Sequence, residues 1–278
     1  AGKIPSISMD LPEGADAAHK RIARVLESQL YQRCGARVDS GTGGDVVVEL
    51  VIAPGGTEDG YTISDRPGGG VLISGNGHRG LLYGIGKFLR SSTYEDGTSN
   101  ATFIPGNWRG SSAPAQPHRA VYWWTHIGPR WRNAQLENIR IDVEEMGLWG
   151  ANVIAGALPV QGGYGNIPGY SNFDDPKLAG LLLRMEIMLT TARELGLRTC
   201  LFIAPNTAYS SAPESIRGTP HNNECGGNHG VNVCPSLPEG EAYLLKQWEG
   251  VLRHFAAIGV DELVFWPYDE GGCAAYGG

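Results

Sequence analysis

Hydrophobic and polar positions follow two different patterns along the chain, and the first pattern occupies about 110 residues. A helix is predicted at 15–33 because Ile22, Val25, Leu26 and Leu30 recur on one stripe. Two short strand-like runs flank the turn Arg66-Pro-Gly-Gly-Gly70, which is typical of a β-hairpin. The elements predicted here are strands at 4–9, 46–53, 61–64 and 71–74 and helices at 15–33 and 80–89. They indicate a small α/β domain.

From His118 onward, strands and helices alternate. Leu136, Ile139, Val143 and Met146 fall at helical spacing, and an apolar strand follows them. Repeated strand–helix units favour a sheet of parallel strands. The loop after the third strand has about 30 residues, far more than the ~4–6 of compact connections, and this length indicates a functional loop. The elements predicted here are strands at 120–124, 151–155, 199–204 and 262–266 and helices at 133–148, 178–195 and 238–258.

A polar stretch separates the two patterns, and the overall composition restricts the partners. Residues 91–117 are rich in Ser, Thr, Gly, Asn and Pro and indicate a linker, which we place at 111–117. Of 278 residues, 41% are hydrophobic, which is enough to fill a core. The net charge of −7 and the lack of a basic run disfavour nucleic acid and anionic membranes as partners. No apolar stretch approaches the ~20 residues of a membrane-spanning helix.

The fourth strand of the second pattern is followed closely by two adjacent carboxylates, Asp269 and Glu270. Enzymes built from parallel strands and helices carry their chemistry at the carboxyl ends of the strands. Two carboxylates at that edge suggest acid/base work on a bond that needs a proton donor, such as a glycosidic bond. The alternative is structural, with the pair capping and starting the next helix.

Other polar and aromatic residues near the strand ends are candidates for binding a sugar. Indole rings stack on sugar rings, while arginine, histidine, asparagine and tyrosine side chains can form hydrogen bonds with hydroxyl groups. The alternative is ordinary core packing for the aromatic residues and turn formation for the loop residues. These substrate-binding candidates are Arg119, Trp124, His126, Asn206, Tyr209, Trp266 and Tyr268.

Five cysteines leave at least one thiol unpaired within the chain, because their number is odd. Cys34 and Cys200 lie in core-like segments and are expected to be buried thiols. The long loop allows a zinc site, a disulfide or free thiols. The zinc-type ligands would be His221, Cys225, His229 and Cys234, and the disulfide would join Cys234 to Cys225 or to Cys273. We assign no metal ligand and expect no cofactor.

Several of these segments resemble one family of carbohydrate-active enzymes. The stretch from Gly75 to Leu89, Gly-Asn-Gly-His-Arg-Gly-Leu-Leu-Tyr-Gly-Ile-Gly-Lys-Phe-Leu, resembles the domain that precedes the barrel in glycoside hydrolase family 20, and also the amino-terminal domain of α-glucuronidases. Val233-Cys-Pro-Ser236, then a helix and a strand ending in Asp269-Glu270, is similar to the fourth βα unit of the family 20 β-N-acetylhexosaminidases. Arg119 matches an arginine that these enzymes use on sugar hydroxyls.

The resemblance implies an α/β fold with an accessory domain at 1–110 and, at 118–278, the first four βα units of a (β/α)8 TIM-type barrel. A complete barrel takes about 250 residues, so a second chain or a further segment is expected to complete it. The resemblance also implies exo-acting, retaining hydrolysis of a terminal N-acetylhexosamine in an oligosaccharide or glycoconjugate. Glu270 would be the general acid, and Asp269 would orient the substrate's 2-acetamido group. The implied location is secreted or periplasmic.

Two departures from the family pattern keep alternatives open. Pro267-Tyr268 stands where the family has Gly-Gly, and Leu158 to Tyr164 replaces a cluster of histidine and acidic residues. The alternatives are an exo-glycosidase similar to α-glucuronidases or α-N-acetylglucosaminidases, and a non-catalytic carbohydrate-binding protein. The α-N-acetylglucosaminidases also carry Trp-rich first strands like Tyr122-Trp-Trp-Thr125.

Overall fold

The computed structural model describes residues 5–95, 102–123, 129–157, 170–218 and 231–265. Contacts between Cα atoms divide the chain into two compact units. Unit 1 comprises Ala1–Ala120, Ile141–Asn152 and Thr191–Leu197, and unit 2 comprises Val121–Arg140, Val153–Thr190 and Arg198–Gly278. Each unit combines helices with strands, so the fold is of the mixed α/β class.

Unit 1 is built on a mixed six-stranded sheet with the order β2-β1-β3-β5-β4-β8. Its strands are β1 (Ile7–Asp10), β2 (Val38–Ser40), β3 (Val46–Ile52), β4 (Tyr61–Asp65), β5 (Val71–Gly75) and β8 (Gly110–Ser112). The predicted hairpin is confirmed, because β4 and β5 pair antiparallel with Ile63 opposite Ile73. Gly70 closes its turn with a φ of +103°, and a Cβ atom there would collide with the carbonyl group of Val47.

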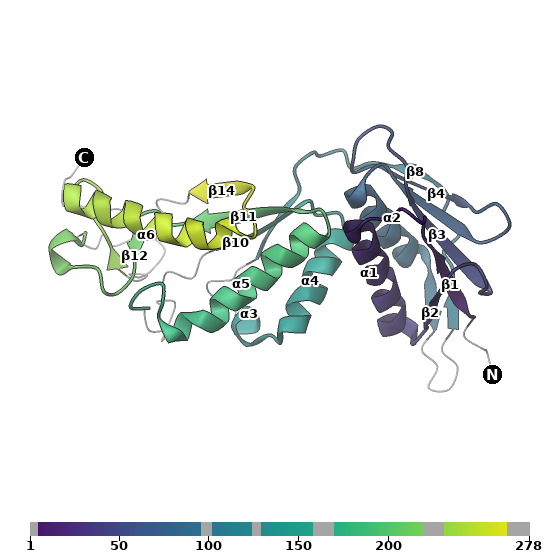
Figure 1. Cartoon of the computed structure of the whole chain (residues 1–278), viewed down its shortest axis with the longest axis horizontal. Coiled ribbons are helices and arrows are strands. Elements are labelled where there is room, and N and C mark those ends of the chain that lie inside the picture. Colours follow the sequence, from purple (N-terminus) through teal and green to yellow (C-terminus); the bar gives the residue numbers. More distant parts are fainter. Residues whose placement is uncertain (1–4, 96–101, 124–128, 158–169, 219–230, 266–278) are drawn as a thin grey trace. The chain divides into compact units, whose positions relative to one another are not determined.

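Helices α1 (Ala17–Cys34) and α2 (His78–Ser91) pack on each other, and α2 packs against β3, β4 and β5 (Figure 1). The Asp16 side chain caps α1 by accepting a hydrogen bond from the backbone N–H of His19 at 2.8 Å. Gly35 ends α1 with a φ of +69°, which favours glycine. The apolar stripe predicted for the first helix is fully buried and, with Leu81, Leu82, Ile85 and Leu89 of α2, forms part of the core of this unit.

Two segments from later in the chain also belong to unit 1. They are the carboxyl-terminal parts of α4 (Leu136–Leu148) and α5 (Pro176–Glu194), each with the residues that follow. Arg21 on α1 binds buried Glu144 at 2.5 Å and Glu194 at 3.1 Å. The Tyr83 hydroxyl on α2 donates a hydrogen bond to the Ala151 carbonyl oxygen at 2.9 Å. These polar contacts hold the later segments to α1 and α2.

Unit 2 contains a four-stranded sheet with the order β14-β11-β10-β9. The strands are β9 (Ala120–Trp123), β10 (Val153–Ala157), β11 (Arg198–Ile203) and β14 (Glu262–Phe265), and the helices of this part are α3 (Pro129–Asn133), α5 and α6 (Pro238–Ala256). The pairs β10–β11 and β11–β14 are parallel, which confirms the prediction from the strand–helix alternation. Val153, Ile154 and Ala155 are buried, as expected of a central parallel strand.

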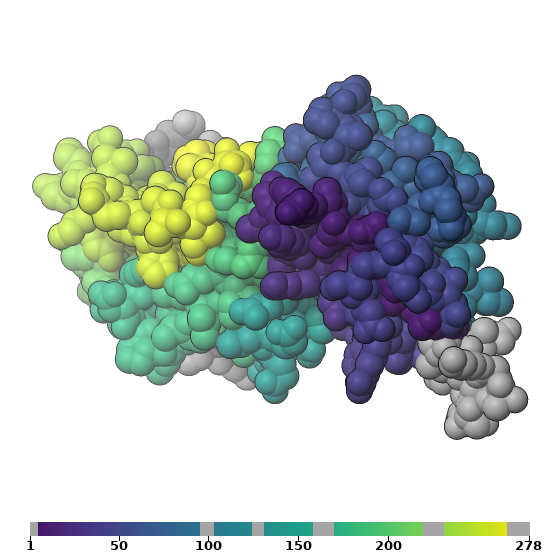
Figure 2. Space-filling model, turned by 45° about the vertical axis from the view of Figure 1, so that its right-hand side comes forward, coloured from purple at the N-terminus to yellow at the C-terminus, as the bar shows by residue number. Residues whose placement is uncertain are grey.

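Strand β14 lies at the edge of the described sheet, and its apolar side chains are exposed. Leu263, Val264 and Phe265 all reach solvent, with Phe265 61% exposed. Since successive side chains of a strand point to opposite faces, both faces of β14 are partly exposed. Figure 2 shows α6 and β14, in yellow-green to yellow, at the surface.

The stretch 91–117 contains strands, although its composition had indicated a linker. We interpreted this stretch as a linker, yet its described part contains β6 (Thr93–Glu95), β7 (Thr102–Ile104) and β8. Strand β6 pairs antiparallel with β7, and β8 pairs with β4. Polar side chains do not prevent pairing at a sheet edge, because the ladder is made by backbone groups. The predictions also missed β2 and α3, and within the long loop they missed the ribbon of β12 (Thr207–Ala208) and β13 (Val231–Asn232).

Candidate functional site

The carboxyl ends of the parallel strands of unit 2 are the natural place to look for a site. Strands β10, β11 and β14 run in the same direction, so their carboxyl ends share one edge of the sheet. The sequence puts the acidic pair just after β14, which ends at Phe265. The candidates that lie outside the described residues are Trp124, His126, Trp266, Tyr268, Asp269 and Glu270. Arg119, Asn206 and Tyr209 are described.

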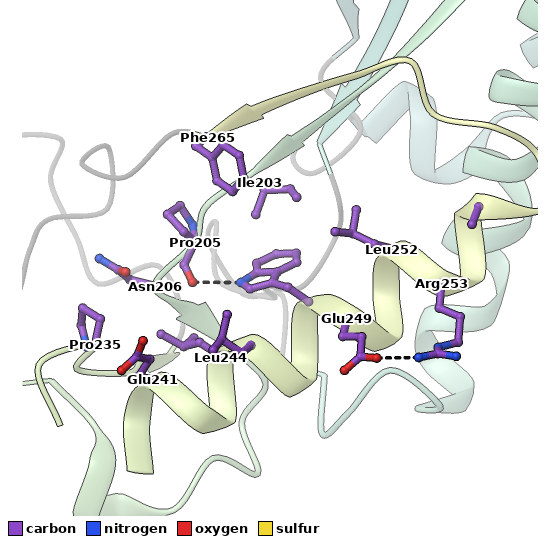
Figure 3. Close-up of a pocket in the computed structure, with 13 residues that line it drawn as sticks. Ile203, Pro205, Asn206, Pro235, Glu241, Leu244, Glu249, Leu252, Arg253 and Phe265 are labelled. Carbon is purple, nitrogen blue, oxygen red and sulfur yellow. Dashed lines mark hydrogen bonds and ion pairs between the residues drawn. The ribbon is translucent and has the colours of Figure 1, made fainter. Parts of the chain in front are cut away.

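Asn206 lies beyond the carboxyl end of β11 and lines a hollow of 760 Å³ (Figure 3). The hollow lies between α6 and the ends of β11 and β14, which contribute Ile203 and Phe265. Its apolar lining from α6 includes Leu244, Trp248 and Leu252. A volume of this size and an apolar lining with few polar groups are typical of sites for small organic ligands.

The Trp248 indole fixes one wall of this hollow. Its Nε1–H donates a hydrogen bond to the Pro205 carbonyl oxygen at 2.9 Å, which joins α6 to the segment after β11. The backbone carbonyl of Asn206 accepts from the Val233 N–H at 2.9 Å, which ties the segment after β11 to β13. Glu241, Glu249 and Arg253 also line the hollow, and the last two form an ion pair at 2.5 Å.

Tyr209 follows Asn206 closely in sequence, but its side chain is buried and does not line the hollow. Its backbone N–H donates to the Gln247 side-chain oxygen at 3.3 Å, and Gln247 in turn donates to the Thr207 carbonyl at 2.9 Å. Burial raises the pKa of the Tyr209 hydroxyl well above its usual range. The described contacts of Tyr209 are therefore those of a residue packed beneath the loop after β11.

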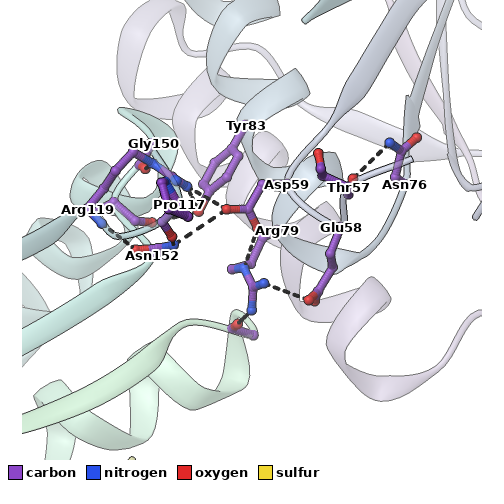
Figure 4. Close-up of polar contacts among 12 residues, drawn as sticks. Thr57, Glu58, Asp59, Asn76, Arg79, Tyr83, Pro117, Arg119, Gly150 and Asn152 are labelled. Carbon is purple, nitrogen blue, oxygen red and sulfur yellow. Dashed lines mark hydrogen bonds and ion pairs between the residues drawn. The ribbon is translucent and has the colours of Figure 1, made fainter. Parts of the chain in front are cut away.

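Arg119 immediately precedes β9, at the amino-terminal end of that strand, and its guanidinium group is bound within unit 1 (Figure 4). Its Nη2 donates to Asp59 Oδ2 at 2.7 Å and to the Tyr83 hydroxyl at 3.1 Å. Its Nε donates to the Gly150 carbonyl at 2.6 Å, and its backbone N–H donates to Asn152 Oδ1 at 2.8 Å. The predicted site residues that the structure describes are thus divided, with Arg119 in unit 1 and Asn206 and Tyr209 in unit 2.

Asp59 is the centre of this network. Its Oδ1 accepts from Arg79 Nε at 2.6 Å, while Oδ2 accepts from Arg119, so a single carboxylate joins two guanidinium groups. Arg79 also binds Glu58 at 2.6 Å and the Gly196 carbonyl at 3.2 Å. Burial acts to raise the pKa of Asp59, but the hydrogen bonds and charges of Arg119 and Arg79 outweigh it and hold the pKa below 3.8. Asp59 is therefore a carboxylate at neutral pH.

No local pattern in the sequence indicates the roles of Asp59, Tyr83 and Asn152. Asp59 stands in Thr57-Glu-Asp-Gly60, which has the composition of an ordinary turn, and its partner Arg119 is 60 residues away. Trp248 could have been found, because it shares a helical stripe with Leu244 and Leu252.

The cysteines and the proposed zinc ligands are only partly described. Cys34 and Cys200 are buried free thiols, as predicted, and Cys234 is also a buried free thiol. His221, Cys225, His229 and Cys273 lie outside the described residues. Within the described ranges, no group of three or more histidine, cysteine or acidic side chains is arranged to hold a metal ion. No helix in those ranges is long and apolar enough to span a membrane.

Solved structures of family 20 glycoside hydrolases share the fold of this chain, although no protein-family model and no curated protein sequence matches it. A chitobiase of Flavobacterium johnsoniae matches 97% of the chain with a TM-score of 0.62 and 14% identity. A family 20 β-N-acetylhexosaminidase of Streptomyces coelicolor matches 94% with a TM-score of 0.61 and 16% identity. A family 20 exo-β-N-acetylglucosaminidase of Vibrio harveyi matches 93% with a TM-score of 0.59 and 13% identity.

The match covers 43% of the chitobiase, 56% of the Streptomyces enzyme and 42% of the Vibrio enzyme. The chain therefore spans about half the length, or less, of these structures. Identities this low are evidence for the fold alone. Together with the parallel strand–helix units of unit 2 and the mixed sheet of unit 1, they show that the chain has a fold like that of the glycoside hydrolase family 20 β-N-acetylhexosaminidases.

Proposed function

We propose that this chain is part of a glycoside hydrolase that removes a terminal N-acetylhexosamine from an oligosaccharide or glycoconjugate. The observation that carries the proposal is the acidic pair Asp269-Glu270, which follows the fourth parallel strand of a family 20-like fold. In barrels of this kind, the carboxyl ends of the strands bear the catalytic groups. The proposal includes an accessory domain at 1–110 and, at 118–278, the first four βα units of a TIM-type barrel.

The proposed mechanism is retaining and assisted by the substrate. Glu270 donates its proton to the glycosidic oxygen as the bond to the anomeric carbon breaks. The carbonyl oxygen of the substrate's 2-acetamido group attacks that carbon, and Asp269 holds the acetamido N–H. Glu270, now a carboxylate, then removes a proton from the water that opens the cyclic intermediate, which restores the acid.

Two adjacent residues can serve one site only where the strand has ended, because side chains alternate between faces within a strand. Strand β14 ends at Phe265, and Pro267 lacks the N–H group that a continuing ladder would need. Gly271-Gly272 follows and allows a tight change of direction. These features support a shared site for Asp269 and Glu270.

The structure supports some of the predicted substrate-binding residues more than others. Asn206 supports the proposal, because it lines a hollow at the carboxyl ends of β11 and β14. Only their sequence positions support a role in substrate binding for Trp124, His126, Trp266 and Tyr268. Tyr209 would have to leave its buried position, and Arg119 would have to release Asp59 to bind a sugar hydroxyl. We therefore give these two the smallest part in substrate binding.

The exposed apolar edge strand β14 supports a further proposal about assembly. A strand at the edge of the described sheet, with uncovered apolar side chains, favours pairing with another strand. We infer that a further segment of the polypeptide or a second chain adds at β14 and continues the barrel. Action on extracellular glycans would suit a secreted or periplasmic protein.

Turnover of a panel of aryl glycosides tests the proposed activity. The panel contains the β-N-acetylglucosaminide, the β-N-acetylgalactosaminide, the α-N-acetylglucosaminide and the α-glucuronide. We expect cleavage of a β-N-acetylhexosaminide, with a kcat/KM that Glu270→Gln lowers and that Glu137→Gln leaves unchanged, since Glu137 is an exposed carboxylate of α4. If the folded protein cleaved none of the four glycosides, the result would contradict the proposal and favour a carbohydrate-binding protein.

A second candidate activity rests on Pro267-Tyr268 and on Leu158 to Tyr164, the two stretches that depart from the family 20 pattern. They favour a different sugar on the same architecture, as in an α-glucuronidase-like or α-N-acetylglucosaminidase-like enzyme. Cleavage of the α-glucuronide or the α-N-acetylglucosaminide, with no cleavage of either β-substrate, would select this candidate.

A further inference from the structure

Trp149 is the most exposed large apolar side chain of the described residues. It follows the last residue of α4 in unit 1 and is 71% exposed to solvent. The backbone N–H of Trp149 donates to the Glu145 carbonyl at 3.0 Å, which continues the helical turn and holds the backbone of Trp149 in place. A tryptophan side chain combines a large apolar face with a polar N–H edge, and this combination is enriched at binding interfaces.

One side of this indole is supported by an arginine. The Arg90 guanidinium carbon lies 4.6 Å from the centre of the Trp149 ring, in the range of a cation–π contact. Arg90 is itself held by a hydrogen bond from Nη1 to the Leu148 carbonyl at 2.5 Å. The indole is thus backed by a fixed charged plane, and its exposure leaves room for a ligand against the ring.

Charged groups with hydrogen-bonding capacity lie beside the ring. Arg33 pairs with Glu145 at 3.4 Å, and both side chains are about one-third exposed. Glu145 lies one helical turn before Trp149, so its side chain is a neighbour of the indole on the helix surface, and its ion pair brings Arg33 to the same side. The Arg33 guanidinium carbon lies 5.5 Å from the centre of the Tyr94 ring, so a cation–π contact also helps to hold this guanidinium group in place. The cluster therefore combines an open aromatic face with one acceptor and one donor group at its side.

We propose that Trp149, flanked by Arg33 and Glu145, is a binding site on unit 1 for one pyranose ring of an oligosaccharide. The apolar C–H face of a pyranose would cover the indole, and neighbouring hydroxyl groups would bond to the Glu145 carboxylate and the Arg33 guanidinium. An aromatic anchor with a few convergent polar groups is the usual chemistry of such sites. All of these residues belong to unit 1, and binding at them needs no turnover.

Binding to three soluble hexasaccharides tests the proposal: the hexamers of β-linked N-acetylglucosamine, glucose and xylose. Calorimetry is done in the Glu270→Gln background, so that hydrolysis does not remove the ligand. We expect one hexasaccharide to bind and Trp149→Ala to weaken it about tenfold or more, with a smaller loss in Glu145→Gln. Tyr31→Ala is the matched control, because Tyr31 is an aromatic residue of the same unit with 60% exposure.

Equal affinities of the Trp149→Ala and Tyr31→Ala proteins would overturn the proposal, as would the absence of binding by any hexasaccharide. Sedimentation velocity distinguishes a contact between protein chains. If Trp149→Ala converted an oligomer to a monomer and left sugar binding unchanged, the exposed indole would be an assembly contact. Because binding is measured without turnover, failure of this proposal leaves the glycosidase proposal standing, and the reverse also holds.

Discussion

Replacing Asp59 with asparagine removes the carboxylate shared by Arg79 and Arg119. The two contacts measure 2.6 and 2.7 Å, and the Asp59 side chain is only 13% exposed. The arginine side chains are 17% and 19% exposed, so water replaces the lost charge poorly. The introduced amide would retain one oxygen acceptor and place an NH2 group against one of the two guanidinium groups. The variant therefore leaves two largely buried guanidinium groups without the carboxylate charge that they share.

The expected loss of stability follows from these contacts. A hydrogen bond to a charged group contributes about 1.5–3 kcal/mol, and breaking a buried ion pair costs about 3–5 kcal/mol. One retained acceptor and the nearby Glu58 offset part of this, so we expect the free energy of unfolding to fall by roughly 2–4 kcal/mol. With a urea dependence of about 3 kcal/mol per molar, the unfolding midpoint should move down by about 1 M.

Asp65→Asn is the matched control for Asp59→Asn. Asp65 also binds an arginine, Arg109, at 2.8 Å, but its side chain is 84% exposed, so the expected loss is only about 0–1 kcal/mol. The pKa of Asp59 is held below 3.8, so its contribution is present above pH 3.8 and is lost as the pH falls through its folded-state pKa. Equal midpoint shifts for the two variants at pH 7, or a difference that persists in strong acid, would refute this reasoning.

Two further predictions concern buried titratable groups. Burial lowers the pKa of His19, although the hydrogen bond to the Leu50 carbonyl acts to raise it, so the stability that the neutral imidazole contributes should be lost as the pH falls below 6.5. The melting temperature of His19→Gln should therefore drop less between pH 7.5 and 5.5 than that of the parent protein. An unchanged drop would count against a neutral, buried imidazole. Burial, with a smaller effect of the Glu262 charge, raises the pKa of the Cys200 thiol to about 11. When the native protein is treated with iodoacetamide at pH 8, mass spectrometry should therefore find Cys200 unmodified. Rapid alkylation of Cys200 would contradict its burial.

Local patterns predicted most helices and strands, because their signals lie within a few residues. The stripe of Ile22, Val25, Leu26 and Leu30 is buried as predicted, and the β4–β5 hairpin forms around its glycine-rich turn. Asp175, which precedes Pro176, caps α5 by accepting a hydrogen bond from the Lys177 N–H at 3.0 Å, which is again a local arrangement. The short strand β8 was missed because its pairing depends on β4, far away in sequence.

The candidate site was harder to predict, because sequence position does not report what a side chain binds. Arg119 was selected for its place at the first strand, but it precedes β9 and its guanidinium group forms hydrogen bonds within unit 1. Tyr209 was selected for its place after a strand, yet it is packed beneath the loop. Both outcomes depend on distant partners such as Asp59 and Gln247, which no local periodicity reveals.

The central claim is that Glu270 protonates a leaving oxygen, and leaving-group dependence tests it most directly. Two glycosides of the sugar cleaved in the panel are compared, a 4-nitrophenyl glycoside, whose leaving group needs little protonation, and a methyl glycoside, whose leaving group needs full protonation. We expect Glu270→Gln to lose about 10²–10⁴-fold in kcat/KM on the methyl glycoside and much less on the 4-nitrophenyl glycoside. An equal loss on both substrates, or no loss on either, would contradict the assignment of Glu270 as the general acid.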